Sequence, residues 1–378
     1  MIAKALLRMI GLSLALLVGT AVAPPLAKAA EDVVKIGLSA PLTGDWAEYG
    51  NFFKLSVEMV FDRVNRMGGV RGKRVELVVA DSRGDPKESV LIAEMFLADP
   101  DILAEIGDFS SSSCMAAAPI YERANMTQLS PTSSHPDFTK KGKNMFRVVA
   151  TQAAEGPFNA EWAVKGLGAK RVATIYINND WGVSANKHFV AAVKRMGGEV
   201  VAEEAFITGE KDFTSVLTKI KQAKPDVLYL PTFYADASAI MRQAKRMRFT
   251  PPVLSTGSLY SPELIKLGGS AVEGLMTTSQ YFPDDTRPAA QEFTRMFRDR
   301  YGKDPNMFAA LAYDAANLMI AAMHKAGVED RAAIGPALES LKGFEGATGT
   351  ISYAESHDPT KQYAKIVIKD GKWMNYKR

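Results

Sequence analysis

Short apolar runs alternate with longer segments of helical period along most of this 378-residue chain. The first pair is a run of strand-forming residues at 33–39 and an amphipathic segment at 51–67, in which Phe52, Leu55 and Met59 recur at intervals of three and four residues. Strands and helices that alternate in this way build a parallel sheet covered by helices. The pattern therefore predicts an α/β fold.

The alternation occurs in two blocks, and a chain of this length exceeds what one hydrophobic core usually organises. In the first block, we expect further strands at 75–80, 102–106 and 126–130, and helices at 86–97 and 115–124. In the second block, we expect strands at 172–177, 200–206, 227–230 and 253–255, and helices at 182–196, 213–223 and 235–247. The sequence thus predicts two α/β lobes.

Residues 1–30 have the features of a secretory signal peptide. Lys4 and Arg8 supply positive charge at the start of a long apolar run, and small residues follow it in the spacing that signal peptidase cuts. We expect cleavage near Ala29 or Ala30 and a periplasmic location. The alternative is an uncleaved anchor, but two prolines interrupt the run, which is shorter than the roughly 20 residues that a bilayer needs.

Export restricts the function classes that fit the chain. A compartment without a nucleotide pool disfavours kinases and nicotinamide enzymes, and we expect no cofactor. The net charge of +4 includes three basic residues of the signal peptide, so the remaining chain is nearly neutral and no nucleic-acid partner is expected. The single cysteine, Cys114, allows no intrachain disulfide. We expect no other apolar run to reach the length that spans a membrane, and therefore a soluble protein.

Polar turns follow the expected strands of the first block, at 43–50, 108–113 and 131–135. Ligands of open parallel sheets bind beyond the carboxyl ends of the strands. The second of these turns contains four consecutive serines at a helix start, where free N–H groups, hydroxyls and the helix dipole suit a carboxylate. Ordinary N-capping by Ser110 or Ser111 is the alternative explanation.

Aromatic side chains follow two expected strands of the second block, in the turns at 178–182 and 232–236. Rings at strand ends can form the wall of a pocket for an apolar or ring-bearing ligand. Packing at the lobe surface explains each of these rings equally well.

The motifs of hydrolases and metalloenzymes are absent from the sequence: there is no Gly-x-Ser-x-Gly elbow and no His-Glu-x-x-His. Four scattered histidines do not favour a metal site. Ser111 and His135 could act as nucleophile and base of a periplasmic hydrolase, although no spacing rule supports the pair. We therefore expect a protein that is not an enzyme.

Motifs that follow one another over nearly the whole chain after residue 30 resemble those of the type I periplasmic solute-binding proteins, in their branched-chain amino acid branch. They lie at 36–44, 65–73, 81–86, 107–113, 130–131, 209–213 and 312–315.

The resemblance implies two Rossmann-like lobes, joined by three crossings, with a ligand cleft between them. Lobe 1 would comprise residues 31–150 and 280–352, and lobe 2 residues 151–279 and 353–378. The protein would close around a small carboxylate-bearing solute and deliver it to the permease and ATPase of an ABC importer. A freely closing cleft is compatible with a monomer, which we expect. A ligand sensor that docks on a signalling partner is the alternative within the same fold.

The resemblance also implies which residues of this chain form the ligand site, by their positions in the sequence. In lobe 1, Tyr49 matches the aromatic residue that closes over the ligand, and Ser111, Thr132 and Ser134 match the groups that hold its carboxylate. The residues that match the aromatic closure from lobe 2 are Trp181, Phe233 and Tyr234.

The acid that pairs with the ligand ammonium in the Leu/Ile/Val binders would fall near Gly257, where this chain has no carboxylate. A buried ammonium without a countercharge is costly, so Asp236, Asp108 or another acid would have to take its place. Aromatic acids, aliphatic acids and amides therefore remain open as ligands beside branched-chain amino acids.

Overall fold

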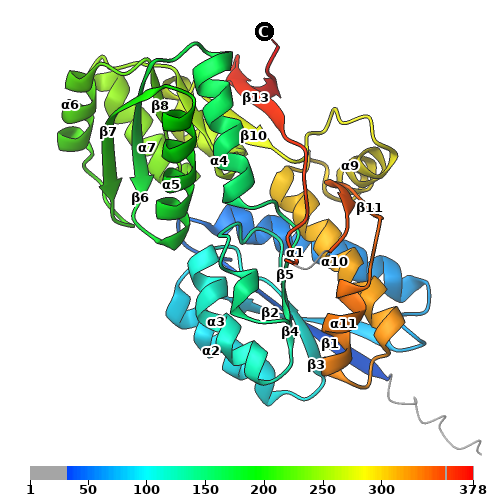
Figure 1. Cartoon of the computed structure of the whole chain (residues 1–378). Coiled ribbons are helices and arrows are strands. Elements are labelled where there is room, and N and C mark those ends of the chain that lie inside the picture. The colour runs from blue at the N-terminus through cyan, green and yellow to red at the C-terminus, as the bar shows by residue number, and fades with distance from the viewer. Residues whose placement is uncertain (1–31, 354–355, 378) are drawn as a thin grey trace, which may run out of the picture. The chain divides into compact units, whose positions relative to one another are not determined.

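The computed structural model describes residues 32–353 and 356–377, and it has two α/β lobes, each built on its own sheet (Figure 1). The predicted fold class is confirmed. We call the lobe with the five-stranded sheet lobe 1 and the lobe with the seven-stranded sheet lobe 2. The expected signal peptide lies outside the described residues.

The sheet of lobe 1 is parallel throughout, with the strand order β2-β1-β3-β4-β5. Its strands are β1 (Val33–Ala40), β2 (Arg74–Asp81), β3 (Ile102–Ile106), β4 (Thr127–Ser130) and β5 (Met145–Arg147). The helices between them are α1 (Ala47–Arg66), α2 (Pro86–Ala98) and α3 (Ser111–Arg123). Every residue of β3 and β4 is buried, as expected for strands covered by helices on both faces.

Local sequence signals explain where these helices begin and end. Asp85 caps α2 by accepting a 2.7 Å hydrogen bond from the backbone N–H of Lys87, and Pro86 occupies the first turn, where no N–H is needed. After α1, Gly68 and Gly69 adopt φ values of +100° and +75°, a conformation that glycine tolerates best.

The sheet of lobe 2 has the order β14-β13-β10-β9-β8-β6-β7. Its strands are β6 (Arg171–Ile177), β7 (Glu199–Phe206), β8 (Val227–Tyr229), β9 (Val253–Ser255), β10 (Met276–Ser279), β13 (Ala364–Lys369) and β14 (Lys372–Asn375). Its helices are α4 (Gln152–Glu161), α5 (Asp180–Arg195), α6 (Thr214–Ala223), α7 (Tyr234–Arg246) and α8 (Pro262–Gly268). The last two strands are antiparallel to their neighbours, so this sheet is mixed rather than purely parallel.

The chain returns to lobe 1 between these strands. The returning elements are α9 (Pro288–Tyr301), α10 (Met307–Ala326), α11 (Ile334–Glu339), β11 (Phe344–Gly346) and β12 (Gly349–Ile351). Short 3₁₀ or π turns lie at Thr139–Lys141, Trp162–Gly166, Gly257–Leu259, Gly269–Ala271 and Arg331–Ala333.

Helix α10 is long and apolar enough to span a membrane, alone among the helices of the described residues. The protein itself buries 78% of the apolar window, and the helix packs against α1. This burial identifies α10 as a core helix. The expectation that no second apolar segment reaches spanning length was therefore wrong, because a core helix can have the same length and composition.

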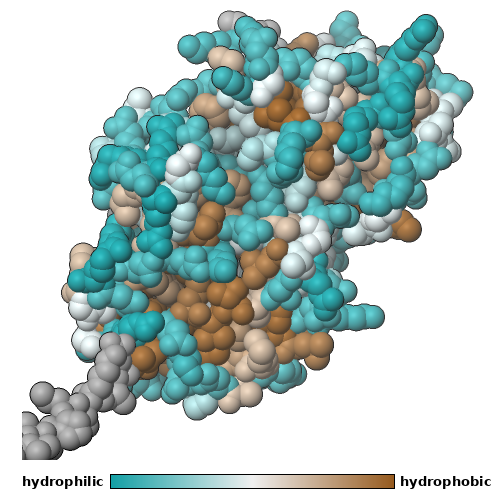
Figure 2. All heavy atoms as spheres, turned by 180° about the vertical axis from the view of Figure 1, so that it is seen from behind, coloured by the Kyte–Doolittle hydropathy of each residue, from teal (hydrophilic) through white to brown (hydrophobic). Residues whose placement is uncertain are grey.

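Packing rather than a disulfide holds the lobes together, since Cys114 is a buried free thiol. Seen from behind, the surface is largely hydrophilic, with an apolar area on lobe 1 (Figure 2). The large apolar side chains that are exposed are Met67, Leu91, Met95, Val183, Ile207, Leu267 and Met374.

The chain passes between the lobes after β5, after β10 and after β12 (Figure 1). The sheet to which a strand belongs assigns that strand to its lobe. The residue boundaries of the two lobes that we expected from the sequence stay a prediction.

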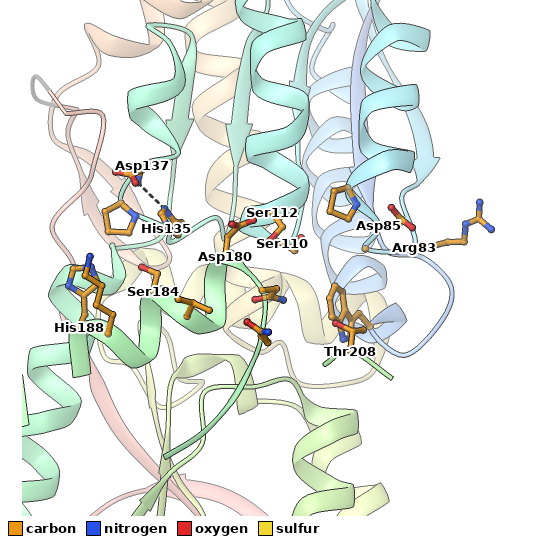
Figure 3. Close-up of a pocket in the computed structure, with 18 of the residues that line it drawn as sticks. Arg83, Asp85, Ser110, Ser112, His135, Asp137, Asp180, Ser184, His188 and Thr208 are labelled. Atoms are coloured by element: carbon orange, nitrogen blue, oxygen red, sulfur yellow. Dashed lines mark hydrogen bonds between the residues drawn. The ribbon is translucent and has the colours of Figure 1, made fainter. Parts of the chain in front are cut away.

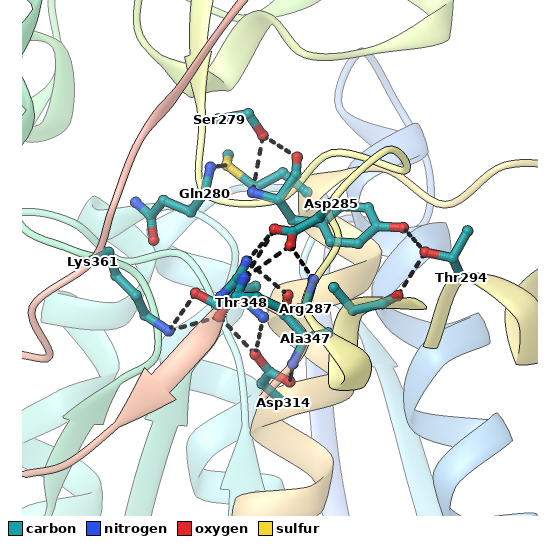
Figure 4. Close-up of polar contacts among 12 residues, drawn as sticks. Ser279, Gln280, Asp285, Arg287, Thr294, Asp314, Ala347, Thr348 and Lys361 are labelled. Atoms are coloured by element: carbon teal, nitrogen blue, oxygen red, sulfur yellow. Dashed lines mark hydrogen bonds and ion pairs between the residues drawn. The ribbon is translucent and has the colours of Figure 1, made fainter. Parts of the chain in front are cut away.

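A buried polar network joins α10 to the second and third crossings (Figure 4). The carboxylate of Asp314 accepts hydrogen bonds from the N–H groups of Ala347 (2.7 Å) and Thr348 (2.8 Å) and from the Thr348 hydroxyl (2.6 Å). Lys361, from the third crossing, donates to the same hydroxyl at 2.6 Å. Burial lowers the pKa of Lys361 to about 8, although the Asp314 carboxylate opposes this shift. The network thus joins one residue of the third crossing to the turn between β11 and β12 in lobe 1.

We expect the substitution Asp314→Ala to lower the free energy of unfolding by about 3–5 kcal/mol, because it leaves two backbone N–H groups and the Thr348 hydroxyl without their acceptor and removes the negative charge near the buried Lys361. Urea denaturation of the ligand-free protein measures the change. Glu292→Ala on the exposed face of α9 is the matched control and should change stability little. Equal midpoints for Asp314→Ala and the wild type would show that the network does not stabilise the fold.

Candidate ligand site between the lobes

A small inner cavity lies where the two lobes meet. Its volume is about 40 Å³, which holds only a few water-sized groups at about 10–15 Å³ each. The residues that line it are Phe109, Ser110, Thr132, Ser134, Val149, Glu155, Trp181, Phe233, Thr256, Gly257, Ser258, Gln280, Met307 and Phe308. The cavity therefore brings together five of the residues expected from the sequence: Thr132, Ser134, Trp181, Phe233 and Gly257.

The start of α3 supplies hydrogen-bond donors to the lobe 1 wall. Ser110 is the N-cap residue, and its hydroxyl oxygen accepts from the N–H of Ser113 at 3.1 Å, which leaves its own proton free to donate. The N–H groups of Ser111 and Ser112, in the first turn, have no intrahelical acceptor. This wall suits a negatively charged group.

The loop after β4 contributes two more hydroxyls with different capacities. Thr132 donates its proton to the carbonyl of Phe109 at 2.7 Å, so its oxygen can only accept from a ligand. The Ser134 hydroxyl accepts from the indole N–H of Trp181 at 3.0 Å, which leaves its proton free to donate. Because Trp181 belongs to lobe 2, this hydrogen bond also joins the lobes.

Aromatic rings from both lobes form the rest of the wall. Trp181 stacks on Phe233 with a centroid distance of 4.9 Å and an interplanar angle of 24°. Phe109 of lobe 1 lies 5.4 Å from Phe233 and 6.0 Å from Phe308. The sequence pointed to the rings of lobe 2. It did not single out Phe109, which stands inside the polar turn, or Phe308, which lies in the apolar helix α10.

Tyr49 of lobe 1 is fully buried beside the cavity and forms hydrogen bonds to lobe 2. Its hydroxyl donates to the carbonyl of Ser258 at 2.8 Å and accepts from the backbone N–H of Tyr234 at 3.1 Å. Its ring stacks on Phe109 at 4.3 Å. Burial raises the pKa of the phenol, so it stays a donor. Tyr49 and Tyr234 thus lie next to the inner cavity, not among the residues that line it.

Glu155, in the first turn of α4, places a carboxylate in the cavity wall. Its Oε1 accepts from the N–H of Gly257 at 2.9 Å and from the Thr278 hydroxyl at 2.6 Å. A side chain at position 257 would meet Met307, since a Cβ there would lie 2.8 Å from the methionine methyl. A carboxylate from another element thus lies against Gly257.

Sequence reasoning missed Glu155 because it predicted no helix at 152–161 and sought site residues in the turns that follow strands. The two acids that it named lie elsewhere. Asp108 is buried within lobe 1, where it accepts from Ser89 at 2.8 Å, and Asp236 faces Thr232 at 3.4 Å. Burial raises the pKa of Asp236 to about 6. Neither lines the inner cavity.

Ser111 also points away from the inner cavity. Its hydroxyl accepts from the backbone N–H of His135 at 3.2 Å. The imidazole Nδ1 of His135 accepts from the N–H of Asp137 at 3.1 Å (Figure 3). The hydroxyl therefore meets the backbone of His135 rather than its ring, and the nucleophile and base of a hydrolase do not form. The neighbouring Ser110 takes the place expected for Ser111.

A second, larger cavity of about 1050 Å³ shares Ser110 with the inner one. Side chains of both lobes face it, including Arg83, Asp85 and Asp137 from lobe 1 and Asp180 from lobe 2 (Figure 3). These charged groups are mostly exposed, so the larger cavity is the polar, water-facing mouth of the cleft. The inner cavity, with rings and a few convergent polar groups, has the character of a ligand site.

Comparison with known proteins agrees with this architecture. The family described as periplasmic binding protein matches residues 33–372. The Leu/Ile/Val-binding protein homolog 3 of Brucella melitensis is 29% identical over 335 residues, which cover 88% of this chain and 90% of the relative. The crystal structure of a leucine-binding protein from Thermotoga maritima superposes with a TM-score of 0.87 at 31% identity, covering 91% of this chain and 98% of that one.

A putative branched-chain amino acid ABC transporter protein from Rhodospirillum rubrum is 37% identical, with a TM-score of 0.67 and coverage of 91% and 100%. A two-lobed fold with a cleft of this kind defines a solute-binding protein, and the family consists of binding proteins rather than enzymes. The chain belongs to the periplasmic binding protein family.

Proposed function

We propose that this protein captures a small carboxylate-bearing solute between its lobes and delivers it to an ABC importer. The observation that carries the proposal is the inner cavity, in which free donors of lobe 1 face the rings of lobe 2. The names of the relatives add support, since they bind leucine or belong to a branched-chain amino acid transporter. The carboxylate would lie against the start of α3 and the Ser134 hydroxyl.

Capture requires that the closed form be stabilised by the solute. A ligand shifts the equilibrium toward closure only by its differential affinity for that form. A solute in contact with Ser134 and Phe233 would touch both lobes at once, and the importer would recognise the closed surface. We further propose that residues 1–30 are removed near Ala29 or Ala30, that the protein is periplasmic, and that it acts as a monomer.

We expect at least one member of a panel of leucine, isoleucine, valine, threonine, alanine and benzoate to raise the thermal midpoint. At 100 times its dissociation constant, a ligand adds about 2.7 kcal/mol to the free energy of unfolding. Differential scanning fluorimetry measures the shift, and uptake of the same solute should fall when the gene is deleted. A panel without any shift, or a solute that is chemically altered on recovery, would contradict the proposal.

Tyr49→Phe should weaken binding of the solute about 10- to 100-fold, because closure then leaves the Ser258 carbonyl and the Tyr234 N–H without their shared partner. Isothermal titration calorimetry measures the loss. Tyr301→Phe removes a phenol that donates to Leu55 at 2.6 Å within lobe 1, and this control should bind as the wild type does. Equal affinities for both variants would show that the Tyr49 contacts do not hold the closed form.

Ser134→Ala should lower the affinity about 10- to 100-fold, since a hydrogen bond to a charged group contributes about 1.5–3 kcal/mol. Ser133→Ala removes a neighbouring buried hydroxyl that does not line the cavity, so it serves as the control. The comparison is made by calorimetry at constant pH. Unchanged affinity for Ser134→Ala would remove this hydroxyl from the carboxylate site.

A further inference from the structure

We propose that Glu155 binds a positively charged amine of the solute, which makes the solute an α-amino acid or a similarly small zwitterion rather than a simple organic acid. The inference rests on the proposed function, because it requires that the solute occupy the inner cavity. It adds the group that selects among carboxylate-bearing solutes, at a position that the sequence motifs do not indicate.

The geometry of Glu155 fits a binding role. Two donors, the Gly257 N–H and the Thr278 hydroxyl, both approach Oε1. They fix the carboxylate in the wall without neutralising it, because neither donor carries a charge. A carboxylate oriented in advance by neutral donors loses little conformational freedom when a ligand binds.

The charges around the cavity are unbalanced. Among the described residues that line the inner cavity, Glu155 is the only acidic one, and none is a lysine, an arginine or a histidine. Burial raises the pKa of Glu155, and its negative charge in turn helps to raise the pKa of the nearby phenols of Tyr229 and Tyr363. A buried carboxylate without a cation is costly, and a ligand ammonium would supply the missing charge.

The lobe 1 wall of the cavity favours a group of the opposite charge, an anion. The start of α3 and the hydroxyls of Ser110 and Ser134 favour an anion, whereas Glu155 favours a cation. Both walls border the same space of about 40 Å³. A ligand that meets both walls carries a cation and an anion, as an α-amino acid does with its amine and its carboxylate.

The test uses matched pairs that differ by the amine alone: leucine with 4-methylpentanoate, and alanine with propanoate. Calorimetry on the wild-type protein should show at least one amino acid binding about 100-fold or more tightly than its amine-free partner, the effect of leaving a buried charge unpaired. Glu155→Gln should reduce the affinity for that amino acid by a similar factor and should not weaken binding of the amine-free acid.

Glu161→Gln, two turns further along α4, removes an exposed carboxylate paired with Lys165 at 3.1 Å, and this control should bind as the wild type does. Glutamine at position 155 retains an oxygen for the Gly257 and Thr278 donors, so the ligand-free variant should unfold no earlier than the wild type. If that variant is unstable, the matched pairs on the wild-type protein still decide the question.

Two outcomes separate the inference from the proposed function. If the amine-free acids bind the wild type as tightly as the amino acids, or if Glu155→Gln binds the amino acid unchanged, the role of Glu155 is overturned while solute capture stands. If neither the amino acids nor the amine-free acids nor benzoate bind the wild type, the proposed function fails and the role of Glu155 fails with it.

Discussion

The cost of burying polar groups between two lobes is the constraint on which this structure depends. Closure removes the carboxylate of Glu155 and the hydroxyls of Ser110 and Ser134 from bulk water. Polar groups that lose water without gaining a partner raise the free energy of the closed form, and a complementary solute reverses this penalty. Ligand recognition and lobe closure are therefore the same physical event, and the groups that select the solute are those that closure would otherwise leave unsatisfied.

Aromatic contacts across the interface set how readily the lobes close. The rings of Tyr49, Phe109 and Phe233 lie within 4.3–6.1 Å of one another across the interface, and the Tyr49 hydroxyl bridges both lobes. At the crossings, the network around Asp314 restrains the hinge segments on the lobe 1 side. The protein thus combines a hydrogen-bonded network near the crossings, an aromatic interface between the lobes and a small polar site.

Local patterns predicted β1 to β4 and β6 to β9, because buried parallel strands are short apolar runs, and β3 and β9 have the predicted limits. They did not predict β5 or the strands from β10 onward. Helix α1 begins at Ala47, four residues before the amphipathic pattern becomes visible. The antiparallel strand β13 was missed because its pairing depends on a distant segment. The same holds for the site. Hydroxyls and rings that follow strands could be located, whereas Glu155 reaches Gly257 through tertiary packing that no local pattern encodes.

The most direct test of this account is a crystal structure of the protein with the amino acid that binds most tightly. The account predicts density in the inner cavity, with the carboxylate against the start of α3 and Ser134 and the amine within hydrogen-bond distance of Glu155. A ligand seated in the outer cavity, or one whose amine points away from Glu155, would contradict it.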